Sequence, residues 1–253
     1  ILNNLEFDHA DIFADITAIE TQFHHLVRTV PKSGCLVVNA AEESLERVLK
    51  RGCWSIAEKF GVQAASSDWA LQDTQDDGFK VIYKNEEVAE VIWDRDASVT
   101  GRHNQLNALA AIAAANHIGV SPKEAATALG SFKNVKRRME VVGRVNGITI
   151  YDDFAHHPTA ITTTIDGLRR KIGRASGTRL LAVLEPRSNT MKLGVMKSQL
   201  PESLKDADLV FGYGANSGKD ALGWDLKESL APLGEKAAAF DNLDQLILAV
   251  KAK

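Results

Sequence analysis

A run of small and β-branched residues at 147–150 leads directly into the polar stretch Tyr151-Asp152-Asp153-Phe154-Ala155-His156-His157-Pro158. A helical pattern of apolar residues then covers residues 159–172. A strand, a short turn and a helix in direct succession are typical of an α/β fold. In an open α/β sheet such a turn lies at the carboxyl end of its strand, where ligands bind.

The turn at residues 152–157 carries two carboxylates and two imidazoles. Pro158 suits the first turn of the following helix, because the N–H that proline lacks would have no partner there. The free N–H groups and the positive dipole end of this helix could face a phosphate. The pattern alone leaves four interpretations open: a metal site, acid–base chemistry, nucleotide binding, or a polar loop with no ligand.

Strands and helices alternate through the rest of this half of the chain. Asn146-Gly147 lies between β-like runs at 139–145 and 148–151, which indicates a hairpin, because both turn residues need a positive φ. The later patterns predict a strand at 179–184, a helix at 193–206, strands at 208–211 and 236–240, and a helix at 243–253. This alternation predicts a mostly parallel sheet.

The earlier residues also mix the two kinds of element. Ser121 and Glu124 have the spacing of a capping box, so a short helix begins there, and we place a domain boundary near residues 131–135. The patterns before it predict a strand at 1–5, a helix at 12–30, a strand at 35–38, a helix at 42–51, a hairpin of 79–84 and 87–94, and a helix at 105–117.

Composition excludes some classes of partner. The 253 residues carry a net charge of −3, which gives no reason to expect a nucleic acid partner. No apolar run reaches the roughly 18 residues of a membrane span, so we expect no membrane insertion. Cys35 and Cys53 are too few for a disulfide scaffold and fit the reduced thiols of a cytoplasmic protein.

Two further groups of polar residues are candidate site residues. Asp8-His9 follows the first predicted strand, and a carboxylate beside an imidazole suits Mg²⁺ or phosphate, although a solvated loop would look the same. His103, Asn104 and Asn107 lie at a helix start, and the two asparagines share a face. Because an amide both donates and accepts, they suit a purine edge or a ribose; the alternative is that Asn104 only caps the helix.

Two arginine-containing stretches complete the candidates. Lys136-Arg137-Arg138 precedes the hairpin, and an arginine there could contact phosphate through its planar guanidinium, although such a triplet is usually a solvated face. Arg187-Ser188-Asn189-Thr190 follows the strand at 179–184. One arginine with three neutral hydrogen-bonding residues suits a carboxylate-bearing substrate; the alternative is a capped helix entry.

Taken in order, these pieces resemble the Mur ligase family of ATP-dependent amide-bond-forming enzymes. The motifs that carry the resemblance are Asn3 to Asp11, Gly101-Arg102-His103-Asn104 with Asn107, Arg137-Arg138-Met139-Glu140, and the turn from Asp152 to Pro158. Within the family, the stretch from Asp152 to Ala160 and Glu185-Pro186-Arg187-Ser188-Asn189-Thr190-Met191-Lys192 are most similar to the member that joins UDP-N-acetylmuramate to the murein tripeptide L-alanyl-γ-D-glutamyl-meso-diaminopimelate in cell-wall recycling.

The resemblance implies ATP and Mg²⁺ as cofactors and an acyl phosphate intermediate. It also implies two domains: residues 1–132 as part of the central ATP-binding domain, and residues 133–253 as a Rossmann-like C-terminal domain that begins with a β-hairpin. By motif, His9 would be the catalytic Mg²⁺ ligand. The nucleotide would be contacted by His103, Asn104 and Asn107 at its adenine and ribose, by Asp153 at its ribose, by Arg138 at a phosphate, and by His156 on the phosphate side. The incoming peptide would be held by Arg187, Ser188, Asn189 and Thr190.

The sequence departs from the family pattern in two respects. The family's phosphate loop and UDP-binding domain would precede Ile1, and a glycine-rich stretch would follow Lys253, so we expect a fragment that is inactive by itself. The position of the carbamylated lysine found in many members falls at His24. Two alternatives remain: the L-alanine-adding ligase of the same family, against which Glu185-Pro186-Arg187-Ser188-Asn189-Thr190 argues, and a non-catalytic nucleotide-binding or sugar-nucleotide sensor module.

Overall fold

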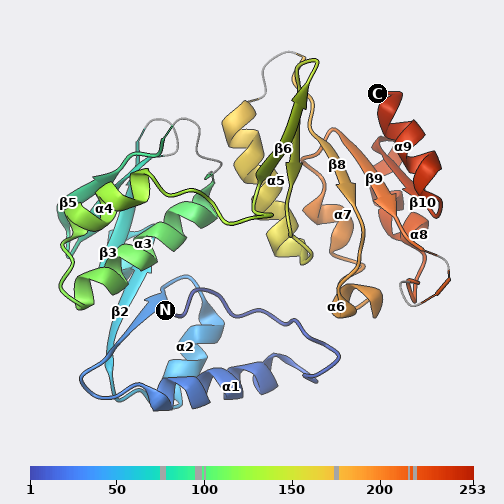
Figure 1. Cartoon of the computed structure of the whole chain (residues 1–253). Coiled ribbons are helices and arrows are strands. Elements are labelled where there is room, and N and C mark those ends of the chain that lie inside the picture. The colour runs from blue at the N-terminus through green and yellow to red at the C-terminus, as the bar shows by residue number, and fades with distance from the viewer. Residues whose placement is uncertain (75–77, 95–98, 100, 174–176, 216, 219–220) are drawn as a thin grey trace. The chain divides into compact units, whose positions relative to one another are not determined.

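The computed structural model describes residues 1–74, 78–94, 99, 101–173, 177–215, 217–218 and 221–253. The chain forms two compact units (Figure 1). The first unit comprises Ile1–Phe7 and Phe13–Asp152, and the second comprises Asp8–Ile12 and Asp153–Lys253. The short segment Asp8–Ile12 therefore belongs with residues that lie much later in the sequence.

The first unit contains a five-stranded mixed sheet. Neighbouring strands β1, β2 and β3 are parallel, whereas β3, β4 and β5 are antiparallel. The β4–β5 pair is the predicted hairpin, which is confirmed; β2 and β3 were not predicted. In sheet order the strands are β1 (Cys35–Asn39), β2 (Ile56–Gly61), β3 (Trp69–Asp73), β4 (Phe79–Tyr83) and β5 (Glu86–Val91).

Helices cover both faces of this sheet. Successive side chains of a strand point to opposite faces, and β1 shows it: Val37 packs in a cluster with α3, whereas Leu36 and Val38 pack in a second cluster with α1 and α2. The capping box of Ser121 and Glu124 is present at the start of α4. The helices are α1 (Ile16–Thr29), α2 (Glu43–Lys50), the 3₁₀ turn η1 (Ala64–Ser66), α3 (Arg102–His117) and α4 (Pro122–Gly130).

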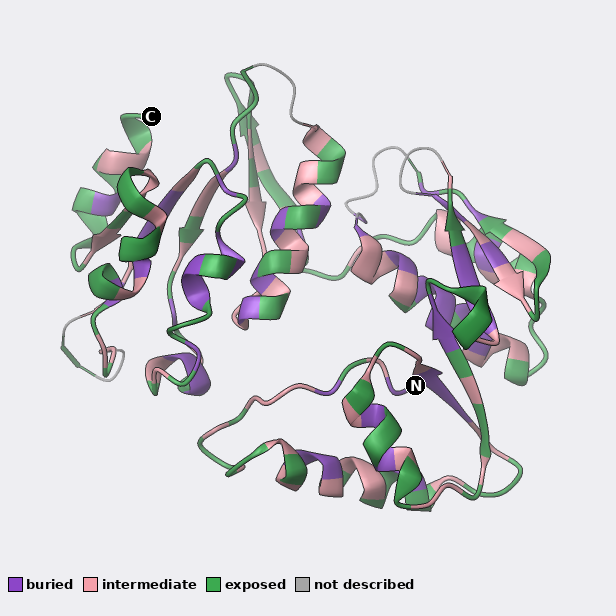
Figure 2. Ribbon diagram, turned by 180° about the vertical axis from the view of Figure 1, so that it is seen from behind, coloured by how far each residue is buried: buried purple, intermediate pink, exposed green. Residues whose placement is uncertain are grey.

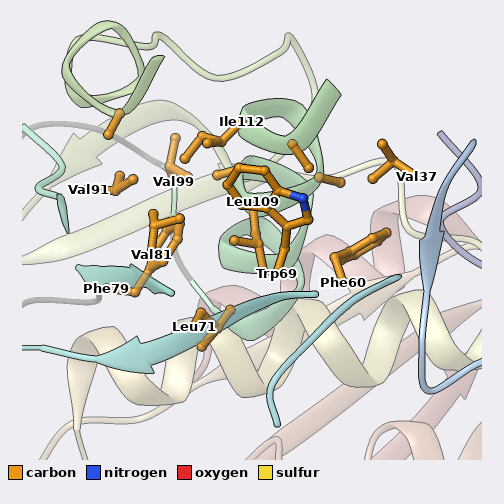
Figure 3. Close-up of a cluster of buried hydrophobic side chains, with 14 of the residues drawn as sticks. Val37, Phe60, Trp69, Leu71, Phe79, Val81, Val91, Val99, Leu109 and Ile112 are labelled. Carbon is orange, nitrogen blue, oxygen red and sulfur yellow. The ribbon is translucent and has the colours of Figure 1, made fainter. Parts of the chain in front are cut away.

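The larger cluster of the first unit is built around Trp69. Its indole is fully buried and packs with Phe60, Leu109 and Ile112 between the strands and α3 (Figure 3). The indole Nε1 donates to Glu58 Oε2 at 2.6 Å, so the polar atom of this large side chain has a partner. Figure 2 shows buried positions of this unit gathered on its strands and on α3.

The first unit ends in a separate two-stranded hairpin, β6 (Glu140–Val145) and β7 (Ile148–Asp152). Asn146 and Gly147 have φ values of 49° and 79°, as a tight Asn-Gly turn requires. The predicted hairpin is therefore confirmed. The candidate turn that begins at Asp152 lies at the carboxyl end of β7.

The second unit contains a three-stranded parallel sheet. Strand β9 lies between β8 and β10 and is parallel to both (Figure 1). The predicted parallel sheet is confirmed. The elements are α5 (Pro158–Ile172), β8 (Leu181–Leu184), α6 (Asn189–Lys192), α7 (Leu200–Ser203), β9 (Leu209–Tyr213), α8 (Leu226–Leu230), the 3₁₀ segment η2 (Ala231–Lys236), β10 (Ala237–Phe240) and α9 (Leu243–Lys251).

The single helix predicted at 193–206 is wrong. Within that range only Leu200–Ser203 (α7) is helical; α6 ends just before it, at Lys192, and turns separate the two short helices. Gly194 has a φ of 74°, a left-handed conformation that an α-helix cannot contain. The indole of Trp224 lies 2.8 Å from the place where a Cβ at position 194 would be, so a side chain there would clash. The left-handed backbone at Gly194 therefore interrupts the helix, and Trp224 packs closely against this glycine.

Two expectations for the N-terminal residues also need correction. Instead of a strand at 1–5, only Leu2 bridges β1, next to Val38. The helix predicted from residue 12 begins at Ile16, because the Asp15 side chain caps it by accepting from the Ala18 amide. Ile12, predicted to lie on its apolar face, is 70% exposed.

Two observations bear on the environment of the protein. Among the described residues, no helix combines the length and the apolar character that crossing a membrane requires. Cys35 and Cys53 are both free thiols. Partial burial raises the pKa of the Cys35 thiol, and the nearby Glu58 carboxylate adds to this effect, so the thiol is kept protonated and unreactive.

Candidate functional site

The loop Asp8–Ile12 is folded tightly around the Asp8 carboxylate. Asp8 Oδ1 accepts hydrogen bonds from the His9 amide and from the Thr190 hydroxyl, each at 2.7 Å. His9 has a φ of 52°, a left-handed conformation that non-glycine residues rarely adopt. The Ile12 amide donates to the His9 carbonyl at 2.8 Å and closes the turn. His9 itself is exposed.

The short helix α6 supplies the partners of this loop. Ser188 caps α6 by accepting from the Met191 amide at 3.3 Å. Thr190 is 3% exposed, and its hydroxyl also accepts from the Ala10 amide at 3.3 Å. Asn189 donates from Nδ2 to Asp11 Oδ2 at 2.8 Å. Three of the four residues predicted to hold the peptide are therefore engaged in hydrogen bonds within the second unit.

His156 lies on the other side of the Asp8 carboxylate. Its Nε2 is 3.9 Å from Asp8 Oδ2, and its Nδ1 is 3.0 Å from the Phe154 carbonyl oxygen. Partial burial raises the pKa of Asp8, but the hydrogen bonds from Thr190 and from the His9 amide, with the two imidazoles, outweigh it and hold that pKa below its usual value. The carboxylate therefore stays ionised beside the imidazoles.

The turn after β7 is ordered by its own side chains. Asp153 Oδ1 accepts from the Ala155 amide at 2.8 Å and from the Thr164 hydroxyl of α5 at 3.2 Å. His157 caps α5, since its Nδ1 accepts from the Thr159 amide at 3.3 Å. Pro158 occupies the first turn of α5, as predicted. Asp153 therefore shapes the turn as well as being a candidate ribose contact.

The first unit holds the other group of candidates at the start of α3. The residue before the helix is Gly101, with a φ of 86° and no side-chain cap, so Asn104 is not the cap. Asn107 is exposed, and its Oδ1 accepts from Asn3 Nδ2 at 2.6 Å. Sequence reasoning assigned no role to Asn3, because a contact across 104 residues leaves no local signal.

The arginines before the hairpin have different surroundings. Arg137 Nε lies 3.2 Å from Asp152 Oδ2, so Arg137 is paired within the first unit. Arg138 is exposed, and its carbonyl accepts from Asn134 Nδ2 at 2.8 Å. Arg187 in the second unit is exposed too. Exposed guanidinium groups at Arg138 and Arg187 are suited to bind an anionic ligand.

The described residues do not form a complete metal cage. Nowhere in the described ranges do three His, Cys, Asp or Glu side chains gather to hold a metal ion. Mg²⁺ in phosphoryl-transfer sites usually takes only one or two protein ligands, and substrate phosphates supply others. His9, beside the ionised Asp8, fits such a site. His24 Nε2 is buried and has no hydrogen-bond partner among the described residues, and its ring lies 6.2 Å from that of Trp54.

Comparison with known proteins identifies this arrangement. Residues 1–115 match the Mur ligase middle domain, and residues 137–253 match the Mur ligase, glutamate ligase domain. The chain belongs to the Mur ligase family. The Asp8-His9 loop and the start of α3 lie within the region that matches the middle domain. The turn at 152–157 and α6 lie within the region that matches the glutamate ligase domain.

Individual Mur ligases are also similar to this chain. The UDP-N-acetylmuramate–L-alanyl-γ-D-glutamyl-meso-2,6-diaminoheptandioate ligase of Haemophilus influenzae is 47% identical over 100% of the chain and 53% of the relative. The ligase of the same name from Escherichia coli is 51% identical over 83% of the chain and 45% of the relative. The crystal structure of a murein peptide ligase from Psychrobacter arcticus has a TM-score of 0.66 at 42% identity, over 98% of this chain and 50% of that one. The chain thus spans about half the length of these relatives.

Proposed function

We propose that the protein carrying this chain is an ATP-dependent ligase that joins UDP-N-acetylmuramate to the tripeptide L-alanyl-γ-D-glutamyl-meso-diaminopimelate in peptidoglycan recycling. The observation that carries the proposal is the 47% identity to the Haemophilus ligase of that name over the whole chain. The Escherichia coli relative supports it, since it has the same name and 51% identity. We place the protein in the cytoplasm, where its ATP donor is available.

The proposed reaction consists of two displacement steps. In the first, a carboxylate oxygen of the muramate attacks the γ-phosphorus of ATP, the bond to ADP breaks, and an acyl phosphate forms. In the second, the amine of the tripeptide attacks the acyl carbon, the amide forms, phosphate leaves with the electron pair, and the nitrogen loses a proton. Negative charge accumulates on phosphoryl oxygens in the first step, so positively charged or proton-donating groups accelerate it.

We propose that His9 and His156 face this negative charge. Mg²⁺, when bound, neutralises charge on the transferring phosphoryl group, and His9 would be one of its ligands. The ionised Asp8 carboxylate supports this assignment, because it lies next to His9 in sequence and 3.9 Å from His156 Nε2, and carboxylate oxygens are preferred ligands of Mg²⁺. His156 would face the phosphate side, and Arg138 would add a further cationic contact to phosphate.

Nucleotide and peptide contacts are assigned to the remaining candidates. We propose that His103, Asn104 and Asn107 contact adenine and ribose and that Asp153 contacts the ribose. The exposed Arg187 is suited to bind a carboxylate of the tripeptide, because its planar guanidinium can donate two parallel hydrogen bonds. We propose residues 1–132 and 133–253 as the limits of the two domains.

An ADP-release assay on the intact protein tests the ligase proposal against a non-catalytic nucleotide-binding module. With ATP and Mg²⁺ present, we expect ADP release that requires both UDP-N-acetylmuramate and the tripeptide. Binding of ATP without any acceptor-dependent ADP release would favour the non-catalytic module. In the same assay His9→Ala should lower turnover more than it weakens nucleotide affinity, and full activity of that variant would contradict the metal role.

A further inference from the structure

The loop Asp8–Ile12 is fastened to α6 by two adjacent side chains. Thr190 donates to Asp8 Oδ1 at 2.7 Å and accepts from the Ala10 amide at 3.3 Å. Asn189 donates to Asp11 Oδ2 at 2.8 Å. Two consecutive residues therefore bind three positions of a loop that is about 180 residues distant in sequence.

Burial excludes Thr190 from a surface that a peptide could reach. Its side chain is 3% exposed, and its hydroxyl already donates one hydrogen bond and accepts another. A hydroxyl has one proton to donate, so Thr190 could not donate to a substrate without releasing Asp8. Asn189 is exposed, and one N–H of its amide nitrogen donates to Asp11.

The loop that these residues hold is strained at its functional position. His9 adopts a φ of 52°, a left-handed conformation that residues other than glycine rarely adopt. Such strain persists only where the surroundings determine the conformation, and it is frequent at functional sites. On either side of His9, Thr190 donates to Asp8 and accepts from the Ala10 amide, and these two hydrogen bonds fix the conformation of the loop.

We propose that Thr190 and Asn189 are positioning residues that hold the Asp8–Ile12 loop, and with it His9, on α6, and that the peptide contact within Arg187 to Thr190 falls to Arg187. The link to catalysis rests on the proposed function. The attachment of the loop does not, because it is a property of the folded chain. Thr190 then acts on the reaction through His9, whereas Arg187 acts on the substrate.

Amide hydrogen exchange of the whole chain, followed by mass spectrometry, tests the attachment. Thr190→Val keeps the shape of the side chain and removes both hydrogen bonds, so the amides of residues 8–12 should exchange faster, on the order of tenfold. Thr190→Ser keeps the hydroxyl and should exchange like the unmodified chain. Ser203→Ala is the matched control, because Ser203 is buried in the same unit and its hydroxyl, within the part of the chain that the structure describes, bonds only the Leu200 carbonyl; it should leave the loop unchanged.

Steady-state kinetics of the intact protein tests the role in the reaction. A positioning role predicts that Thr190→Val lowers kcat on the order of tenfold while the KM for the tripeptide stays within about twofold, and that Thr190→Ser restores kcat. A raised KM with unchanged loop exchange would overturn the proposal, as would faster exchange with unaltered kcat, or loop exchange that Ser203→Ala increases equally. If the unmodified protein forms no amide product, the proposed function fails, and the exchange result still decides whether α6 holds the loop.

Discussion

Asn3 donates a hydrogen bond from its Nδ2 to Oδ1 of Asn107 at 2.6 Å, across 104 residues of sequence. Because the bond occupies the Asn107 oxygen, the amide of Asn107 is fixed in one orientation, with its nitrogen available to donate elsewhere. Removing the Asn3 amide would let the Asn107 amide rotate. A nucleotide contact that depends on its orientation would then weaken.

We therefore expect Asn3→Ala to weaken nucleotide affinity of the intact protein about three- to tenfold, the effect of one surface hydrogen bond. Isothermal titration calorimetry with ADP measures this. Asn4→Ala is the matched control, because the Asn4 side chain donates to nearby Glu6 at 3.1 Å and, among the described residues, to no other group. Equal affinities of the two variants would contradict a role for Asn3 in positioning Asn107.

Two substitutions of Asp153 separate its effect on the stability of the turn after β7 from its effect on nucleotide binding. Its Oδ1 accepts from the Ala155 amide and the Thr164 hydroxyl, and asparagine retains an oxygen in that place. Asp153→Asn should therefore keep the thermal stability of the chain and still weaken nucleotide binding, because the charge is lost. Asp153→Ala should lower stability as well, by about 1–2 kcal/mol. Unchanged nucleotide affinity of Asp153→Asn would refute the ribose contact.

The buried Glu20 joins α1 to α2. Its carboxylate is 3% exposed and receives Arg47 at 2.8 Å and Arg51 at 2.7 Å. Glu20→Ala should destabilise the first unit by roughly 2–3 kcal/mol, because two charged hydrogen bonds are lost while both arginines can still reach water. Urea unfolding followed by tryptophan fluorescence measures this. Glu46→Ala, which removes an exposed i,i+4 pair with Lys50, should leave stability nearly unchanged, because water screens an exposed pair; similar losses in the two variants would contradict the account.

The surroundings of the Asp208 carboxyl group make the stability of the second unit depend on pH. Partial burial raises the pKa of its carboxyl, but the Leu180 amide at 2.6 Å and the Arg169 guanidinium outweigh this and lower the pKa below its usual 3.8. A lowered folded-state pKa gives stability that is present above pH 3.8 and is lost as the pH falls through the folded-state pKa.

Asp208→Asn should therefore be less stable than the unmodified chain at neutral pH, by at most about 1 kcal/mol because the pair is partly exposed. The difference should shrink below pH 3.8. Thermal melts across this range measure it. Asp166→Asn, which removes an exposed pair with Arg170 at 2.9 Å, is the control; a constant deficit of Asp208→Asn at all pH values would contradict the linkage.

Local sequence signals predicted the elements whose geometry is set by neighbouring residues. Asn146-Gly147 predicted a hairpin because both residues readily adopt a positive φ. Ser121 and Glu124 predicted a helix start because they form reciprocal hydrogen bonds there. The helix predicted at 193–206 failed because Gly194 takes a left-handed conformation, and the Trp224 side chain that packs against it comes from 30 residues further along the chain. Strands β2 and β3 lack strict alternation of buried and exposed residues and were missed.

In the candidate site, too, features set by neighbouring residues could be predicted, whereas contacts between distant segments could not. Residue types in the turn at 152–157 and in Asp8-His9 identified candidate positions but left several kinds of chemistry open, and only the resemblance to the Mur ligases implied nucleotide and Mg²⁺ roles, which stay predictions. Contacts between distant segments were not predictable: Thr190 with Asp8, and Asn3 with Asn107, follow only from the folded chain. For Thr190 the folded chain suggests a different role from the one that its sequence neighbours implied.

A competition assay tests the central proposal most directly. The intact protein is incubated with ATP, Mg²⁺, UDP-N-acetylmuramate and equal concentrations of L-alanine and the tripeptide L-alanyl-γ-D-glutamyl-meso-diaminopimelate, and the products are identified by mass spectrometry. We predict that the tripeptide conjugate is formed and that the L-alanine conjugate is not. Formation of the L-alanine conjugate with no tripeptide conjugate would contradict the proposed substrate.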